Sequence, residues 1–318
     1  MENTRSCASC DAGGRFVIKD IFGKPVRVKN YICSPDGEHY LHKNGDVKLH
    51  LGIAPQSYCP AACPFCIAVN TKQHRRIDTA KLEGTLRGLH EQGLIKSVKI
   101  TGGEPFYDIA LLNEVVNIIF DVFGLGFELS VSTNGMGLDK LHSLEKLSYI
   151  DTLHISRHHY DDAVNRMLFG GADVPDGARL KEIFDTVCFK DIFVFNCMLL
   201  RDTINSPAEA RRFMDFAISV GASKVGFMCC SKINRFAEEQ AIRYEDVIRD
   251  GDPSLLFTRG FYDYDVCHCR DGVYASEKGG LIEFYGRDTR VIETGYSRGL
   301  VFDSDNTLRD GYGGNVIL

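Results

Sequence analysis

The stretch at residues 96–132 reads KSVKITGGEPFYDIALLNEVVNIIFDVFGLGFELSVS, and it decides the fold. The short apolar runs at 96–101 and 127–132 have the length and composition of buried strands. Between them, residues 109–123 place apolar side chains at helical spacing. A strand, a helix and a second strand in this order predict two parallel strands joined by a right-handed crossover.

The same alternation continues on both sides of this unit. Further strands are expected at 47–54, 150–156, 191–199 and 222–228, and further helices at 78–92, 138–147, 177–184 and 206–220. Six strands alternating with helices predict an α/β fold, in the form of a partial (β/α)6 barrel or an open α/β sheet. In either form, the side chains that carry out chemistry gather at the carboxyl ends of the strands.

Two flanking segments lie outside the alternation. The first is a short N-terminal extension with a possible β-hairpin at 15–32, which turns near Gly23. The second is rich in Gly, Asp and Tyr and has a short β pattern at 280–285. The chain is thus expected to divide into an N-terminal extension at 1–46, a barrel at 47–228 and a C-terminal extension at 229–318.

Composition and charge restrict the possible partners. The chain has 318 residues, of which 44% are hydrophobic and 25% charged, as in ordinary globular proteins. Its net charge of −6 disfavours long nucleic acids as partners. No apolar run approaches the roughly 20 residues that span a bilayer, and the N-terminus has no apolar core of the signal-peptide type. We therefore expect a cytoplasmic protein without a membrane partner, in which thiols stay reduced.

Three of the twelve cysteines lie in the segment CPAACPFC at 59–66, directly after the first strand of the predicted barrel. Cys59, Cys63 and Cys66 are spaced so that three thiolates on one short loop can hold three irons of a cubane cluster. The fourth iron then keeps an open position for a substrate or cofactor. The alternative is a zinc site completed by His74.

This cysteine pattern, with Phe65 before the last cysteine, resembles the defining motif of the radical S-adenosylmethionine (SAM) superfamily. The resemblance covers 47–228 and is closest to the branch of the molybdenum-cofactor cyclase and the twitch- or SPASM-type maturases. It implies that SAM chelates the open iron of a 4Fe–4S cluster through its amino and carboxylate groups. It also implies that the cluster, reduced by a partner such as flavodoxin or ferredoxin, cleaves SAM to a 5′-deoxyadenosyl radical, which abstracts a hydrogen atom from the substrate.

Two further motifs stand at strand ends. The segment TGGEP at 101–105 is similar to the GGEP motif of the superfamily, which holds the amino group of SAM; its glycines allow close backbone approach. The segment STNG at 132–135 is similar to a segment whose hydroxyl and amide groups contact SAM. An Arg after the fourth strand suits a carboxylate. The resemblance thus implies the SAM-binding residues Phe65, Gly102, Gly103, Glu104, Ser132, Thr133, Asn134, Ser156, Arg157 and Asn196.

Relatives in this branch often carry an auxiliary iron–sulfur cluster in a C-terminal extension. The resemblance implies the ligands Cys229, Cys230, Cys267 and Cys269 for such a second cluster. The pattern departs from that of the cyclase, because CxC replaces CxxC and no later cysteine follows. Alternatives are a cluster that recruits Cys7, Cys10 or Cys33, a zinc site that includes His268, and no metal at all.

Residues that act on the substrate are expected at the mouth of the barrel. His158, His159 and Tyr160 follow the fourth strand and can bind or protonate a polar substrate, since His titrates near neutral pH. The alternative is a solvated loop. Near the C-terminus, residues 311–314 read GYGG, which can reach into the site, although we expect a frayed tail.

The function predicted on this basis is radical SAM chemistry on a small polar substrate. The substrate is a nucleotide, sugar or amino-acid derivative, and the outcome is oxidation, epimerisation or cyclisation. One alternative is a maturase that modifies a ribosomally made peptide. The other is a non-catalytic iron–sulfur binding protein, which has no need of the Gly102–Glu104 and Ser132–Asn134 motifs.

Overall fold

A computed structural model describes residues 16–33, 39–41, 47–67, 74–247, 271–275, 281–285, 296–297 and 299–318. The strands of its main sheet are β5 (Leu49–Ile53), β6 (Ile95–Ile100), β7 (Glu128–Thr133), β8 (Thr152–Ser156), β9 (Phe193–Leu199), β10 (Lys224–Cys229), β11 (Asp271–Ala275), β12 (Leu281–Tyr285), β13 (Gly299–Phe302) and β14 (Leu308–Arg309). Their order is β11-β12-β10-β9-β8-β7-β6-β5-β13-β14.

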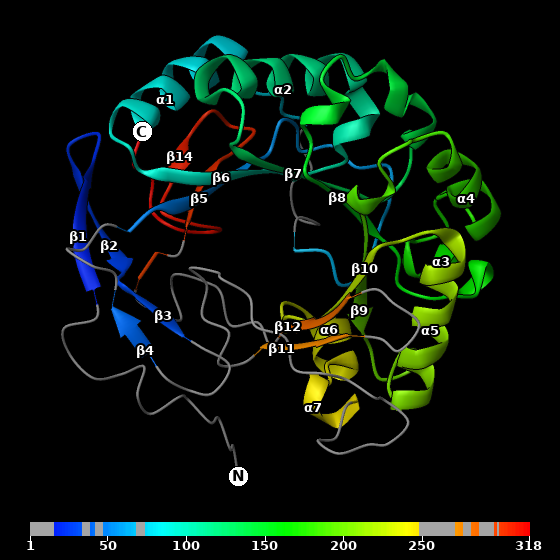
Figure 1. Cartoon of the computed structure of the whole chain (residues 1–318). Helices are drawn as coiled ribbons and strands as arrows, with labels where there is room; N and C mark the ends of the chain where they lie inside the picture. Colours follow the sequence, from blue (N-terminus) through cyan, green and yellow to red (C-terminus); the bar gives the residue numbers. More distant parts are fainter. Residues whose placement is uncertain are drawn as a thin grey trace.

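The eight consecutive strands from β12 to β13 are parallel. The predicted α/β class is therefore confirmed, and the curved parallel sheet in Figure 1 is compatible with the predicted partial barrel. The six predicted strands are β5 to β10. Two parallel strands that follow residue 228 add to their two edges, β12 beside β10 and β13 beside β5. The division of the chain at residues 46 and 228 stays a prediction.

Helices α1 (Thr79–Glu91), α2 (Ile109–Phe123), α4 (Gly177–Asp185) and α5 (Pro207–Val220) lie outside the curved sheet (Figure 1). The shorter α3 (Asp162–Leu168) and α6 (Arg235–Gln240) pack instead in a second buried cluster that contains Phe65, and α7 (Tyr244–Val247) contacts β10. Side-chain caps set where the longer ones begin: the Asp78 carboxylate accepts from the first backbone N–H groups of α1, and the Ser206 hydroxyl accepts from the Glu209 N–H of α5. Helix α2 has the bounds that its sequence predicts.

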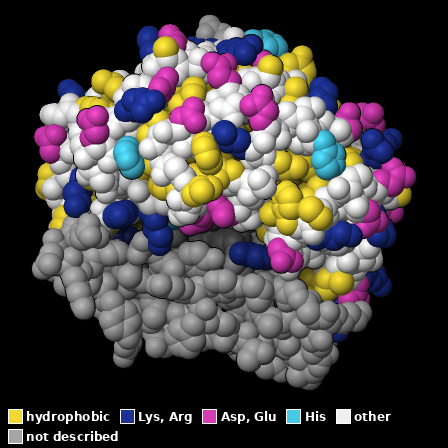
Figure 2. Space-filling view, turned by 45° about the horizontal axis from the view of Figure 1, so that its top comes forward, with side chains coloured by type: hydrophobic (Ala, Val, Ile, Leu, Met, Phe, Trp, Pro, Cys, Tyr) yellow, Lys and Arg dark blue, Asp and Glu magenta, His cyan; other side chains and the backbone are white. Residues whose placement is uncertain are grey.

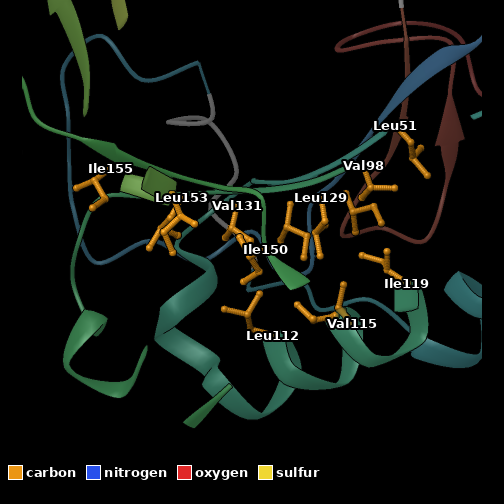
Figure 3. Close-up of a cluster of buried hydrophobic side chains, with 14 of the residues drawn as sticks. Leu51, Val98, Leu112, Val115, Ile119, Leu129, Val131, Ile150, Leu153 and Ile155 are labelled. Atoms are coloured by element: carbon orange, nitrogen blue, oxygen red, sulfur yellow. The ribbon is translucent and has the colours of Figure 1, made fainter. Parts of the chain in front are cut away.

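The main core lies between the sheet and these helices. In β5 the buried residues Leu49, Leu51 and Ile53 alternate with His50 and Gly52, so one face of the strand packs against the helices. Figure 3 shows this packing, with side chains of β5 to β8 facing α2. The opposite face lines the inside of the curved sheet. Its residues include the polar or small His50, Gly52, Ser97, Ser130, Ser132, Thr152, His154, Ser156 and Asn196, together with Lys99 and the apolar Val194 and Met198.

Two local predictions differ from the structure. The helix predicted at 138–147 is wrong, because this segment forms two short 3₁₀ turns, Leu138–Ser143 and Leu147–Tyr149. Glu145 is tied to α2 instead: its N–H donates to the Asn113 amide oxygen at 3.0 Å, and its carboxylate accepts from Asn117 at 3.0 Å. Helix α3 was not predicted, because its seven residues span less than two turns and give too little periodicity.

The N-terminal hairpin of β1 (Phe16–Ile21) and β2 (Lys24–Lys29) confirms the predicted hairpin. Gly23 adopts a φ of +77° at its turn. The neighbouring Phe22 ring packs on α1 at Gly88, where a Cβ would lie only 2.6 Å from the ring. A second, shorter hairpin pairs β3 (Tyr31–Cys33) with β4 (His39–Leu41). The first hairpin thus docks against the helical layer.

The surface carries charges of both signs. On the face in Figure 2, Lys and Arg side chains are interspersed with Asp and Glu side chains, so the coloured part of this face has no extended patch of one sign. Within the described ranges, no helix combines the length and the apolar character that a bilayer crossing requires.

Candidate active site at the carboxyl ends of the strands

The predicted motifs converge at one edge of the sheet. The cysteine loop (residues 59–66) follows β5, the glycine motif (residues 101–105) follows β6, and Asn134 follows β7. Backbone hydrogen bonds join the first two directly. The N–H of Gly103 donates to the Gln56 carbonyl at 2.9 Å, and the N–H of Glu104 donates to the Tyr58 carbonyl at 2.8 Å. The glycine motif is therefore fixed to the segment that leads into the cysteines.

Both glycines are required where these two segments cross. Gly102 has a φ of +105°, and a Cβ there would lie 2.7 Å from the Ala54 Cβ. A Cβ on Gly103 would lie 2.0 Å from the Tyr58 carbonyl oxygen. No side chain fits at either position, which explains the sequence of the motif.

Glu104 is buried beneath the glycine motif, with 1% of its surface exposed. One carboxylate oxygen accepts from the Thr133 hydroxyl at 2.6 Å and from the Phe106 N–H at 3.0 Å. The other accepts from the Asn134 N–H at 2.7 Å. Burial raises the pKa of Glu104 to about 7, against the effect of these three donors. Since a carboxylate has about four acceptor positions, one remains for another donor.

Asn134 connects this carboxylate to the cysteine loop. Its side-chain amide donates to the sulfur of Cys59 at 3.4 Å, while its amide oxygen accepts from the Met136 N–H at 2.9 Å. The motifs after β5, β6 and β7 therefore form one hydrogen-bonded unit that runs from Glu104 through Asn134 to Cys59.

The three cysteines of the loop are partly buried and free of disulfides. Burial, followed by the nearby thiols of Cys66 and Cys59, raises the pKa of Cys63 to about 12. Burial also raises the pKa of Cys59. Thiols that disfavour one another's ionisation are suited to a cationic iron cluster, because bound metal stabilises the thiolates. Three thiols on one short loop are thus a donor set that fits a cubane cluster held by three cysteines.

The alternative zinc site gains no support from the geometry. Among the residues that the structure describes, no three His, Cys, Asp or Glu side chains, Cys59, Cys63 and Cys66 included, lie close enough together to hold a single metal ion, whereas a three-cysteine cubane binds each thiol to a separate iron. His74 stacks on the ring of Tyr58, with 4.4 Å between ring centroids.

His158 lies in an aromatic cluster beneath the cysteine loop. Its ring meets Phe65 edge-on at 4.9 Å and stacks on Phe169 at 4.9 Å. The ring Nδ1 accepts from the Met198 N–H at 3.2 Å, so its proton is on Nε2. Burial, followed by the charge of Arg157, lowers the pKa of His158 to about 3. This lowered pKa argues against the predicted titration of His158 near neutral pH, and its catalytic role stays a prediction.

His159 and Tyr160 also bond within the protein. The His159 Nδ1 accepts from the Asp161 N–H at 2.9 Å, and burial lowers the pKa of this ring. The Tyr160 hydroxyl donates to the Glu209 carboxylate of α5 at 2.7 Å. Tyr160 thus ties the loop after β8 to the outer helical layer. The catalytic roles of these residues stay predictions.

Arg157 is buried, with 1% of its surface exposed, and its guanidinium donates to four groups of the protein. It donates to the carbonyls of His159 at 2.8 Å, Pro175 at 3.2 Å and Tyr160 at 3.3 Å, and to the Asp162 carboxylate. Every nitrogen of the group is engaged, so the side chain shapes the loop after β8. These contacts do not support the predicted role of Arg157 as a SAM ligand, which stays a prediction.

Ser132, Ser156 and Asn196 lie on the inner face of β7, β8 and β9. Ser156 and Asn196 are paired in register, and the Asn196 carbonyl accepts from the Arg157 N–H at 2.9 Å. These residues therefore border the space inside the curved sheet, directly below the loops that carry the motifs.

The neighbouring thiols Cys229 and Cys230 lie in different surroundings. Cys229 packs against the main core, whereas Cys230 belongs to a smaller buried cluster with Phe65, against which Cys63 also packs. Burial raises the pKa of Cys230 to about 11. This separation weakens the prediction that both thiols hold one auxiliary cluster. Cys267 and Cys269, like Cys7, Cys10 and His268, lie outside the described residues.

Some contributors to the site carry no motif. The Gln56 amide donates to the Glu104 carbonyl at 2.7 Å, and the Asn165 amide oxygen accepts from the His158 N–H at 2.9 Å. Phe169 forms the far side of the aromatic cluster. These residues act through contacts between distant parts of the chain, so spacing in the sequence gives no signal for them.

The family model of the radical SAM superfamily matches residues 53–213, so the chain belongs to this superfamily. Members of this superfamily are enzymes that use a 4Fe–4S cluster and SAM. Comparison of the sequence with curated proteins finds no match.

Several solved structures are similar to the chain. SuiB of Streptococcus suis, bound to precursor peptide SuiA, is 20% identical over 62% of this chain and 42% of SuiB, with a TM-score of 0.48. A radical SAM methyltransferase from Sphaerobacter thermophilus is 18% identical over 68% of this chain and 66% of its own, with a TM-score of 0.48. The FeFe-hydrogenase maturase HydG from Carboxydothermus hydrogenoformans is 16% identical over 57% and 44%, with a TM-score of 0.45. The chain thus spans less than half of SuiB and HydG.

Proposed function

We propose that this enzyme reductively cleaves SAM and abstracts a hydrogen atom from a small polar substrate, such as a nucleotide, sugar or amino-acid derivative. The observation that carries the proposal is the hydrogen-bonded unit of Glu104, Asn134 and Cys59. It joins a loop of three cysteines to a glycine motif and to a polar strand end. A protein that only stores an iron–sulfur cluster does not require the last two.

In this proposal Cys59, Cys63 and Cys66 hold the 4Fe–4S cluster. When bound there, the cluster would supply the electron that cleaves SAM, and a partner such as flavodoxin or ferredoxin would reduce the cluster again. The raised pKa values of Cys59 and Cys63 mean that these thiols release protons when they bind iron. Phe65 packs behind the loop against His158 and keeps the neighbouring cysteines in position.

SAM is proposed to lie over the carboxyl ends of β5 to β9. The crossing at Gly102 and Gly103 lets the backbone approach its methionine part. The remaining acceptor position of Glu104 suits its ammonium group, whose charge favours the ionised carboxylate. The proposed contacts are Gly102, Gly103, Glu104, Ser132, Thr133, Asn134, Ser156 and Asn196, with Phe65 and Arg157 shaping the loops around them.

The substrate is proposed to bind inside the curved sheet. The inner face of β7 to β9 presents polar side chains, which include Ser132, His154 and Asn196, beside the apolar Val194 and Met198 of β9. Such a lining is suited to hydrogen bonds with a small polar molecule. His158 is proposed to position the loop, because its Nδ1 accepts from the Met198 N–H and its ring packs between Phe65 and Phe169. A peptide substrate is the alternative, and a second iron–sulfur cluster after residue 228 stays a prediction.

Transfer of deuterium tests the substrate class. The cluster-loaded enzyme is given SAM, dithionite and a mixture of perdeuterated nucleosides, sugars and amino acids, and the mass of the 5′-deoxyadenosine is measured. A parallel sample receives a perdeuterated peptide digest, and the Cys59→Ala/Cys63→Ala/Cys66→Ala variant is the control. Deuterium gained only with the small molecules supports the proposal. Deuterium gained only with peptides would establish the alternative.

A further inference from the structure

The C-terminal residues 308–318 are held in place, so the expected frayed tail is wrong. Leu308 and Ile317 are buried in the main core. The N–H of Ile317 donates to the Leu308 carbonyl at 2.7 Å, and the N–H of Leu308 donates to the Leu318 carbonyl at 2.9 Å. The segment that follows β14 therefore leaves the core and returns to it, and the residues between form a closed loop at 310–315.

This loop is stabilised by its own side chains. The Asp310 carboxylate accepts from the backbone N–H of Asn315 at 2.5 Å and from its side-chain amide at 3.1 Å. The N–H of Gly314 donates to the Gly311 carbonyl at 3.0 Å. A Cβ on Gly314 would lie 2.0 Å from the Asp310 carboxylate, so a side chain there would displace this carboxylate from Asn315. Both ends of the loop are thereby locked.

The loop presents Tyr312 on the inner face of β5. Gly311 and Gly313, with φ values of +136° and +68°, let the chain turn sharply on either side of it. The Tyr312 hydroxyl lies 3.0 Å from where a Cβ on Gly52 would be. The absence of a side chain at Gly52 is what lets the phenol come so close. Tyr312 nevertheless keeps 48% of its surface exposed.

Tyr312 lies next to the glycine motif along β5. Gly52 and Ala54 are two residues apart and point to the same face, about 6 to 7 Å from each other. Gly102 packs on Ala54, and Tyr312 packs over Gly52. The C-terminal loop and the proposed SAM site thus occupy neighbouring positions on one face of the same strand.

We propose that Tyr312 contacts the molecules bound inside the sheet and forms one wall of the chamber in which SAM and the substrate meet. The inference rests on the proposed function and adds a residue that lies outside every motif of the superfamily described above. A phenol offers a flat face to a sugar or base and a hydroxyl for a hydrogen bond. Three glycines and the Asp310–Asn315 contacts hold this half-exposed Tyr in a fixed position, which suits a residue that contacts a ligand.

The chain contains no Trp, so Tyr312→Trp introduces a single fluorophore at this position. The variant is loaded with its cluster, and acrylamide quenching is measured with and without SAM. SAM binding is followed separately by equilibrium dialysis of the labelled compound. Leu125→Trp is the matched control, because Leu125 is 84% exposed at the far end of α2. A Gly52→Ala variant is compared with Gly84→Ala, since Gly84 lies on α1 with open space around it.

We expect SAM to lower the quenching constant of Trp at position 312 about twofold or more, because a ligand covers the exposed half of the ring. The Leu125→Trp signal should not change. Gly52→Ala should weaken SAM binding several-fold by displacing the loop tip, whereas Gly84→Ala should not. If SAM binds but neither quenching at 312 nor the affinity of Gly52→Ala changes, the inference is wrong and the proposed function stands. If SAM does not bind the loaded parent, both are wrong.

Discussion

The side-chain amide of Asn134 donates to the sulfur of Cys59 across 3.4 Å. This contact connects a residue at the end of β7 to the loop after β5, two strands away in the sheet. The backbone N–H of Asn134 also donates to Glu104, and the Met136 N–H donates to its amide oxygen, so the backbone is held by the carboxylate beneath the glycine motif and the amide is held by Met136. The proposed cluster and the proposed SAM site are thus coupled through one residue.

The first prediction concerns the reduction potential of the cluster. A hydrogen bond to a ligating sulfur stabilises the reduced, more negative form. We therefore expect Asn134→Ala to shift the potential to a more negative value, as measured by a redox titration followed by electron paramagnetic resonance. Asn117→Ala is the matched control, since Asn117 bonds to Glu145 on the helical side. Equal potentials in the parent and Asn134→Ala would contradict the assigned contact.

The second prediction concerns Glu104. In Glu104→Gln an NH₂ group replaces one of the two carboxylate oxygens. It then faces N–H or O–H groups that donate to that oxygen in the parent. One buried donor then loses its acceptor, which costs about 1 to 3 kcal/mol of unfolding free energy. SAM affinity should fall as well, because the acceptor for its ammonium group is weakened. Chemical denaturation and equilibrium dialysis measure the two effects. A variant with parental stability would contradict the hydrogen bonds described.

The pKa of about 7 for Glu104 also predicts how the stability of the cofactor-free protein depends on pH. The folded pKa of Glu104 is raised above its ordinary value, so its stabilising contribution is complete below pH 4.5 and is lost as the pH rises through 7. Stability should decline across this window by at most about 3 kcal/mol from this group. Glu104→Gln should lack the decline, and an identical pH dependence in both proteins would refute it.

The third prediction concerns His158, whose pKa is lowered to about 3. A lowered folded pKa means that its contribution is complete above pH 6.5 and is lost as the pH falls towards 3. We expect the ring to remain the neutral Nε2–H tautomer from pH 5 to 8 in nitrogen-15 NMR spectra. His158→Phe should keep the aromatic packing but cost about 1 to 3 kcal/mol, because the Met198 N–H loses its acceptor. A ring that titrates near pH 6.5 would restore it as a catalytic candidate.

The fourth prediction concerns Arg157. Lysine cannot reproduce a planar group that serves three carbonyls and a carboxylate at once. Arg157→Lys should therefore lower the unfolding free energy by roughly 2 to 3 kcal/mol, which thermal unfolding of the purified protein measures. Arg179→Lys is the control, because Arg179 pairs with Glu182 on the surface of α4. If SAM affinity falls while stability is kept, Arg157 is a ligand rather than a positioning residue.

Local pattern predicted much of the fold, as α2 and the six central strands show. The prediction failed at 138–147, where contacts of Glu145 with α2 outweigh helical periodicity. The site divides in the same way. The glycines and cysteines were predictable because each motif is contiguous. The lowered pKa of His158 depends on its burial against Phe65 and Phe169. Phe65 is distant from it in the sequence and Phe169 stands at the end of α3, so no spacing rule brings the three rings together.

The C-terminal loop was missed for a related reason. Two glycines beside Tyr312 read as flexibility when they are considered alone. The order of the loop comes from Asp310, which binds Asn315, and from the burial of Leu308 and Ile317 on either side. The loop packs against β5, which is distant in the sequence, so no local pattern indicates this contact.

The central claim is tested most directly by counting iron and detecting 5′-deoxyadenosine in one experiment. The protein is reconstituted anaerobically with iron and sulfide and then given dithionite and SAM, beside the Cys59→Ala/Cys63→Ala/Cys66→Ala variant. The account predicts that the variant binds about four irons fewer than the parent and that only the parent forms 5′-deoxyadenosine. A total of about eight irons in the parent would add the second cluster. Equal iron in both proteins, or no 5′-deoxyadenosine from a fully loaded parent, would contradict the account.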